Sequence, residues 1–340
     1  MIRFGIVGAG LRGRMYADAL ADQADVEVVA FAEPSTRVAT ATHDATGLPV
    51  VSTHTELLDQ FSLDAVIVAT PDFAHRNAAV DVALAGKHLL VEKPLATNLA
   101  DAYAIRDAIR KGGATCLVGF ENRWNLHVVQ AKRVIASGQV GTHITSSATL
   151  SNSYYVPTQM LSWAAKSSPA WFLMPHTVDM LLWFSGRSPV AVTAVSSSGI
   201  LKARGIDTQD VVHALITFDD GTTASLTSAW TLPDGNDAIV DFHFQFIGTE
   251  GSISGDPIHQ GLDLVTDRRR AQGTLSGRIG KAQVGAPVWM VQEFAANLVL
   301  GQPTGPGVEQ GVLVTEVICA IEESFAEGGM PVRIDSLRHV

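Results

Sequence analysis

The glycine-rich segment near the start of the chain constrains the fold more than any other feature. An apolar run over 2–7 leads into Gly8-Ala9-Gly10-Leu11-Arg12-Gly13, after which the pattern becomes helical. A second apolar run over 26–32 ends at Glu33, which lies 20 residues beyond Gly13. A strand, a glycine turn, a helix and an acidic residue at this distance are typical of a Rossmann unit that binds a dinucleotide.

Each residue of this segment has a physical role in such a unit. Gly8 allows the tight turn, Gly10 lets the backbone approach a pyrophosphate, and Gly13 lets the helix pack closely on the strand. The N-terminus of the helix then faces the phosphates. Glu33 would accept hydrogen bonds from ribose hydroxyls and repel a 2′-phosphate, which favours NAD. Arg37 could pair with such a phosphate, so NADP stays open as an alternative.

The first third of the chain alternates strands with helices, which predicts a doubly wound parallel sheet over 1–121. From 122 to 340 the strands follow one another, and we expect an α+β domain with a large, mostly antiparallel open sheet. Strands are expected at 64–69, 88–91, 115–119, 143–151, 190–198, 210–218, 222–230 and 239–247. Helices are expected at 74–85, 98–111, 124–137, 176–184, 288–300 and 309–327. We interpret 267–285 as a polar loop, and Asp219-Asp220-Gly221 as the turn of a hairpin.

Composition narrows the class of protein further. Lys and Arg number 24 against 34 Asp and Glu, a net charge of −10, which argues against nucleic-acid or anionic-membrane binding. Two cysteines, Cys116 and Cys319, do not make a disulfide framework. The histidines show no metal-ligand spacing, so we expect no metal. We predict a cytoplasmic homodimer or homotetramer, because an open sheet needs a cover on its second face.

Lys93 follows the fourth predicted parallel strand, on the edge where doubly wound sheets bind ligands. Here the sequence resembles the Gfo/Idh/MocA oxidoreductases, and the resemblance extends over nearly the whole chain. It is carried by the glycine loop, Ala69-Thr70-Pro71 with His75, Glu92-Lys93-Pro94-Leu95-Ala96 and His176-Thr177-Val178-Asp179. Weaker matches are Gly119-Phe120-Glu121-Asn122-Arg123, Ile247-Gly248-Thr249-Glu250-Gly251 and Pro331-Val332.

The resemblance implies an NAD(P)-dependent enzyme that oxidises or reduces one carbon of a sugar, polyol or related compound. It places Lys93 at the reacting hydroxyl and assigns proton transfer to His176. A cis bond before Pro94 would also follow from it. Cofactor contacts carry over to the glycine loop, including Leu11 and Arg12, and to positions lining the nicotinamide half of the cleft: Thr70, Pro71, His75, Glu92, Lys93 and Arg123.

The chemistry can also be argued from the residues. Hydride leaves a carbinol carbon only as its hydroxyl loses a proton, so a positioned base is needed. Beside the positive charge of an oxidised nicotinamide the pKa of Lys93 would fall, which makes its amine a usable base. A histidine such as His176 titrates near neutrality. Asp179 shares a helical face with His176 and would orient the imidazole, touch substrate or make a structural bond.

One position departs from the family pattern. Relatives commonly carry Asp four residues before the histidine, where this chain has Phe172. An apolar residue cannot share a proton or bind a hydroxyl, so the substrate could be less polar. Candidate substrate contacts are Asn122, Tyr154, Trp163 and Phe172.

Two other functions stay open beside the dehydrogenase or reductase. One is a redox-neutral glycosidase or lyase of the same family, which returns the hydride to its own NAD. The other is a non-catalytic module that only binds a dinucleotide. Consumption of the cofactor separates the first of these from a dehydrogenase.

Overall fold

The computed structural model describes residues 1–233, 235–236, 238–258, 263–265, 269–271, 276–279 and 282–335. The chain forms two compact units, Met1–Glu121 with Ser276–Thr315, and Asn122–Leu275 with Glu316–Val340. The expected second domain, 122–340, differs from this division because 276–315 belongs to the first unit. The reason is packing: α10 (Ala286–Leu300) lies against α1 (Leu11–Leu20) and β1 (Ile2–Val7). Phe294 meets the ring of Phe4, with 6.1 Å between ring centroids.

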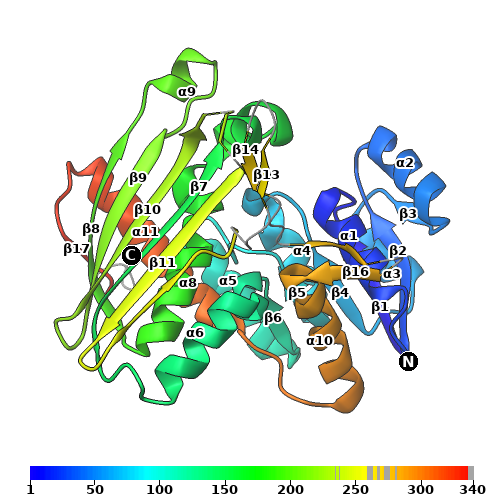
Figure 1. Ribbon diagram of the computed structural model, residues 1–340. Coiled ribbons are helices and arrows are strands. Elements are labelled where there is room, and N and C mark those ends of the chain that lie inside the picture. The colour runs from blue at the N-terminus through cyan, green and yellow to red at the C-terminus, as the bar shows by residue number, and fades with distance from the viewer. Residues whose placement is uncertain are drawn as a thin grey trace. The chain divides into compact units, whose positions relative to one another are not determined.

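The sheet of the first unit is parallel, as predicted, and has six strands, of which the short strand at Val50–Val51 was not predicted (Figure 1). Their order is β3 (Val50–Val51), β2 (Val26–Ala32), β1, β4 (Ala65–Val68), β5 (His88–Val91) and β6 (Cys116–Val118). The chain passes from β1 to β2 and β3 in one direction across the sheet, and then crosses to β4, β5 and β6 on the other side of β1. Right-handed crossovers therefore place α1 and α2 (Thr36–Thr46) on one face. The opposite face carries α3 (His54–Gln60), α4 (His75–Leu84) and α5 (Leu99–Gly112). The carboxyl ends of β1 and β4 therefore form a topological switch point.

Local sequence sets the ends of the helices. Asn98 caps α5 through Oδ1, which accepts the N–H of Asp101 at 2.9 Å, and Gly113 ends the helix with a φ of 66°. Thr53 caps α3 in the same way, accepting the N–H of Glu56 at 3.1 Å. Polar caps and terminal glycines therefore fix where the chain turns back toward the sheet.

The second unit is built on a seven-stranded mixed sheet (Figure 1). Neighbouring strands are antiparallel except for the β7–β10 pair, and the predicted hairpin at Asp219-Asp220-Gly221 joins β9 to β10. The order is β12 (Ser252–Gly255), β11 (Val240–Gly248), β7 (His143–Ser153), β10 (Thr223–Leu232), β9 (Val211–Phe218), β8 (Pro189–Ser197) and β17 (Val332–Arg333). Its helices are α6 (Leu126–Ala136), α7 (Pro169–Phe172), α8 (Met174–Ser185), α9 (Ile200–Ala203) and the second half of α11 (Val308–Ala326).

Short strands occupy part of the segment that was expected to be a loop. β14 (Arg269–Ala271) pairs with β13 (Asp263–Val265), and β15 (Ser276–Ile279) pairs with β16 (Ala282–Gly285). The interpretation of 267–285 as a loop is wrong at these positions. Among the described residues, no helix combines the length and the apolar character needed to cross a membrane.

One face of the second sheet is covered by α8, which packs on β7 and β10. Along β11 the phenylalanines Phe242, Phe244 and Phe246 alternate with exposed polar residues. The ring of Phe184, on α8, lies 5.5 Å from Phe244 and 6.5 Å from Phe246. Alternation on the strand therefore buries one face and leaves the other open.

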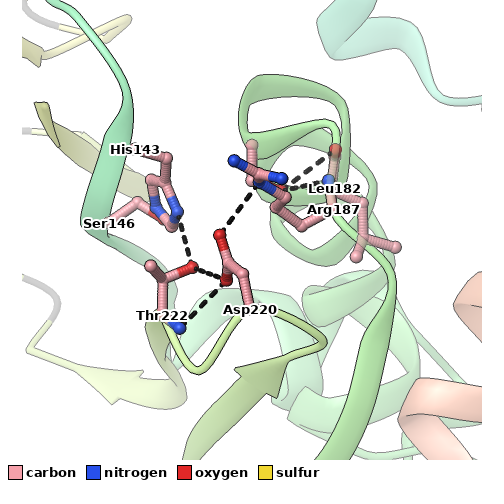
Figure 2. Close-up of polar contacts among 7 residues, drawn as sticks. His143, Ser146, Leu182, Arg187, Asp220 and Thr222 are labelled. Atoms are coloured by element: carbon pink, nitrogen blue, oxygen red, sulfur yellow. Dashed lines mark hydrogen bonds and ion pairs between the residues drawn. The ribbon is translucent and has the colours of Figure 1, made fainter.

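A chain of hydrogen bonds lies at the beginning of β7 (Figure 2). Thr222 donates its one hydroxyl proton to Asp220 at 2.6 Å, so its oxygen accepts from Nδ1 of His143 at 3.1 Å. Nε2 of the neutral ring then accepts from the hydroxyl of Ser146, also at 3.1 Å. Arg187 holds the other oxygen of Asp220 at 3.0 Å. Burial lowers the pKa of His143, consistent with a neutral ring.

Candidate active site

The glycine loop joins the end of β1 to the start of α1. Gly8 has a φ of 97°, and a Cβ there would lie 2.6 Å from the carbonyl oxygen of Ala69. A Cβ on Gly13 would collide with the carbonyl oxygen of Gly8. Both positions therefore require glycine for the fold itself.

Gly10 is different, because, apart from its two chain neighbours, no atom of the described residues comes within 4 Å of the place that its Cβ would occupy. The protein does not need glycine there, whereas a ligand that approaches the backbone would. The position also begins α1, whose first N–H groups can bind an anion. Leu11, the first residue of the helix, is 71% exposed. The loop therefore fits a pyrophosphate.

The side chain of Glu33 reaches the glycine loop from the end of β2. Its carboxylate accepts the N–H of Ala9 at 3.0 Å and the N–H of Ser35 at 2.9 Å. The side chain thus links the glycine loop to the turn after β2 and brings a negative charge to that position. Arg37 lies exposed in the first turn of α2. A carboxylate at the end of β2 fits a ribose that carries two free hydroxyls.

The turn after β4 is held to the turn after β5 by His75. Nδ1 of its ring lies 2.7 Å from the carbonyl oxygen of Pro94, and Nε2 lies 3.1 Å from that of Thr70. Burial lowers the pKa of His75, which favours the neutral ring. We place its one proton on Nδ1, which makes the shorter contact. The bond between Lys93 and Pro94 is cis, as the resemblance implied. Thr70, Pro71 and Lys93 therefore lie on neighbouring turns of one sheet edge.

Lys93 is 9% exposed and is the second residue after β5, which ends at Val91. Burial lowers the pKa of its amine, while the carboxylates of Glu92 and Glu121 act in the opposite direction. Arg12, predicted to bind the cofactor, has carboxylate partners: it lies 3.4 Å from Glu92 and 2.8 Å from Glu121. Its cofactor contact stays a prediction.

His176 and Asp179 lie on α8 in the second unit, and His176 is 9% exposed in the first turn. Of the roles expected for Asp179, the structure favours the structural bond. Arg123 donates to both of its oxygens, at 2.8 and 2.7 Å. The guanidinium also lies 5.0 Å from the centre of the Trp183 ring. The expected contact of Arg123 with the cofactor stays a prediction, and its shown partner is Asp179.

Two tryptophan rings flank Phe172, and the three rings together form an aromatic wall. The ring centroids of Trp163 and Trp230 lie 5.9 and 5.7 Å from that of Phe172. Tyr154 lies under the guanidinium of Arg204, 3.8 Å from the centre of its ring. Asn122 is buried in the turn that follows β6. Two of the predicted substrate residues, Trp163 and Phe172, are therefore in contact.

Three residues of the site were not predicted from the sequence: Glu121, Trp230 and Tyr16, whose hydroxyl donates to Glu92. Tyr16 lies one helical turn after Arg12, a spacing that could have indicated it. Glu121 comes after β6, on the same kind of strand end that pointed to Lys93. Trp230 lies within an apolar strand and has no such signal.

A six-stranded Rossmann sheet with this glycine loop, followed by an open-faced α+β unit, defines a class of two-domain dinucleotide-binding proteins. Residues 2–120 match the family of oxidoreductases with an NAD-binding Rossmann fold, and 128–254 match the GFO/IDH/MocA C-terminal domain. The chain belongs to the GFO/IDH/MocA family.

Several relatives align along almost the full chain. An inositol 2-dehydrogenase of Rhizobium meliloti is 25% identical over 96% of this chain and 97% of its own. A 1,5-anhydro-D-fructose reductase of Ensifer adhaerens is 28% identical over the same shares. The fold is that of scyllo-inositol dehydrogenase from Lactobacillus casei, solved with NAD(H) and scyllo-inositol, with a TM-score of 0.82 and 19% identity over 98% of this chain and 99% of that one.

Proposed function

We propose that the protein is an NAD(H)-dependent dehydrogenase or reductase acting on a carbinol or ketone carbon of a sugar, polyol or related cyclic compound. One observation carries this proposal: Lys93 and the glycine loop follow neighbouring parts of one sheet, at the carboxyl ends of β5 and β1 with β4 between them. The relatives named inositol 2-dehydrogenase and 1,5-anhydro-D-fructose reductase support the substrate class.

Lys93 is the proposed base. Burial favours its neutral amine, which can take the proton of a substrate hydroxyl onto Nζ during oxidation and return it during reduction. NAD, when bound, supplies the hydride acceptor or donor. The residues proposed to hold it are Gly8, Gly10, Gly13 and Glu33, with Thr70, Pro71 and His75 on the nicotinamide side.

His176 is the proposed second proton carrier, in the first turn of α8. We propose that Asp179 acts indirectly, because its carboxylate is held by Arg123 and thereby fixes the face of α8 that carries His176. Phe172, with Trp163 and Trp230 around it, would offer an apolar wall to one face of a ring-shaped substrate.

A screen of sugars, polyols and their keto forms, followed by NADH absorbance, tests the function. Net formation or consumption of NADH with one cyclic compound supports the proposal. A product that forms without net NADH would instead assign the redox-neutral chemistry. Binding of NADH with no turnover of any compound would leave a dinucleotide-binding module.

We also propose a cytoplasmic homodimer or homotetramer assembled through the open face of the seven-stranded sheet. Leu215, between two buried residues of β9, is 42% exposed, and Val195 on β8 is 52% exposed. Leu215 pairs with Thr193 on β8 and with Ser225 on β10, and a second subunit that gives these hydroxyls hydrogen-bond partners can bury them. Light scattering at micromolar concentration should give a multiple of the 36.1 kDa chain, and a monomer mass would overturn this proposal.

A further inference from the structure

A group of charged and polar side chains lies around Lys93. Arg12 and Glu92 were predicted to contact the cofactor, but no member of the group has a role in the proton transfer proposed so far. Arg12 and Tyr16 come from α1, Glu92 is the first residue after β5, and Glu121 follows β6. The two glutamates and Tyr16 are buried. Because charged groups are costly to bury, a cluster of this kind needs an explanation.

The contacts form a path that ends at Lys93. Arg12 places Nη1 2.8 Å from Oε2 of Glu121 and Nε 3.4 Å from Oε1 of Glu92. The hydroxyl of Tyr16 donates to the same Oε1 of Glu92. The other oxygen of Glu92, Oε2, accepts the backbone N–H of Lys93 at 3.1 Å. Glu121 is therefore connected to Lys93 through one guanidinium and one carboxylate.

The backbone leaves Glu92 little room to turn. A Cβ on Gly119 would lie 3.2 Å from both Cα and Oε2 of Glu92. The carboxylate is thus enclosed by backbone on that side and by Arg12 and Tyr16 on the other. The guanidinium of Arg12 bridges the two carboxylates, so the position of Arg12 depends on Glu121 as well as on Glu92.

The charges that face Lys93 come from four parts of the first unit. Glu92 and Glu121 favour its ammonium form, and so does Asp72 in the turn after β4, whereas Arg12 opposes it. The remaining titratable neighbours of this cluster are Tyr16 and His75. At a buried site the dielectric constant is low, so each such charge has a large effect on the protonation of the Lys93 amine.

We propose that Glu121 is a positioning residue for Lys93. Its carboxylate anchors Arg12, and the resulting arrangement holds Glu92 against the Lys93 backbone and sets the electrostatic field in which the amine exchanges its proton. The proposal rests on the proposed role of Lys93 as the base, and it predicts a charge effect that a purely structural glutamate would not produce.

The experiment is an NMR titration of the cofactor-free protein. The chain has seven lysines, so protein labelled with ¹³C at the lysine ε carbon gives few signals, and Lys93→Met assigns the one that matters. In Glu121→Gln the Lys93 signal should titrate about one pH unit lower than in the wild type, because the amide keeps the shape but removes a charge that favours the ammonium. Arg12→Gln removes the opposing cation and should move the midpoint in the other direction.

The matched control is Glu309→Gln. Glu309 pairs with Arg110 at 2.7 Å on the surface of the same unit, so the same chemical change should leave the Lys93 titration in place. The pH profile of turnover in Glu121→Gln should move by the same amount as the NMR midpoint, with NADH binding within about twofold of wild type. A Lys93 titration that coincides with that of the wild type in either cluster variant would overturn the proposal.

The two proposals fail in different ways. If Lys93→Met keeps normal turnover, the role of Lys93 is wrong whatever the NMR result. If Lys93→Met is inactive but Glu121→Gln titrates like the wild type, only the role of Glu121 is wrong. If Glu121→Gln does not fold, Arg12→Gln still tests the proposal. The Lys93 midpoint should move upward in Arg12→Gln, and an unshifted midpoint in that variant also overturns the proposal.

Discussion

The ion pair between Arg123 and Asp179 provides a stability prediction with a built-in control. Asp179 is 1% and Arg123 18% exposed at the side chain, so Arg123→Met leaves a buried carboxylate without its guanidinium. Breaking a buried pair from one side costs about 3–5 kcal/mol. Arg333 and Asp335 form the same two-bond pair, at 3.0 and 2.9 Å, but are 67% and 58% exposed. Arg333→Met should leave the free energy of unfolding almost unchanged, because solvent screens an exposed ion pair.

Urea unfolding of the full chain measures both changes. Tryptophan fluorescence is a suitable probe because Trp183 lies beside the Arg123 guanidinium. Arg123→Met should lower the free energy of unfolding by several kcal/mol more than Arg333→Met does. The double variant Arg123→Met/Asp179→Asn should recover part of the loss, since the buried charge is removed together with its guanidinium. Equal effects of Arg123→Met and Arg333→Met would refute the argument that burial sets the magnitude.

Two further predictions concern the cofactor and the pH dependence of stability. Titration should show that NADH binds more tightly than NADPH, because Glu33 repels a 2′-phosphate; equal or tighter binding of NADPH would mean that Arg37 outweighs Glu33. Burial lowers the pKa of His143 below its ordinary value of 6.5, so the unfolded state takes up the proton first as the pH falls. Stability from this residue should be complete above about pH 6.5 and decrease below it, and thermal denaturation of His143→Gln should lack that part of the decrease. A wild type and variant with the same pH dependence would contradict this assignment.

Much of the first unit could be predicted because its signals are local. Apolar runs ending in glycine or proline located β1, β2, β4 and β5, and helices between them required parallel strands. Parallel strands bring their carboxyl ends to one edge, which is why Glu33, Thr70 and Lys93 could be grouped from the amino-acid sequence. Their proximity follows from the order of strands and helices along the chain.

The features that were missed depend on contacts between distant segments. The return of 276–315 to the first unit depends on which sheet α10 packs against, and its apolar sequence is compatible with either. Arg123 and Asp179 are 56 residues apart in the sequence. Among 24 basic and 34 acidic residues, charge alone does not predict that these two form an ion pair. Glu121 would have been found by applying to β6 the strand-end argument used for β5.

The role of Lys93 is tested most directly by comparing cofactor binding with turnover in Lys93→Met, with His176→Ala measured beside it. Lys93→Met should bind NADH with near-normal affinity but lose two or more orders of magnitude in turnover, the usual scale for an acid–base group. His176→Ala should likewise lose turnover rather than cofactor affinity. Near-normal turnover in Lys93→Met, with the substrate found by the NADH screen, would contradict the proposed mechanism.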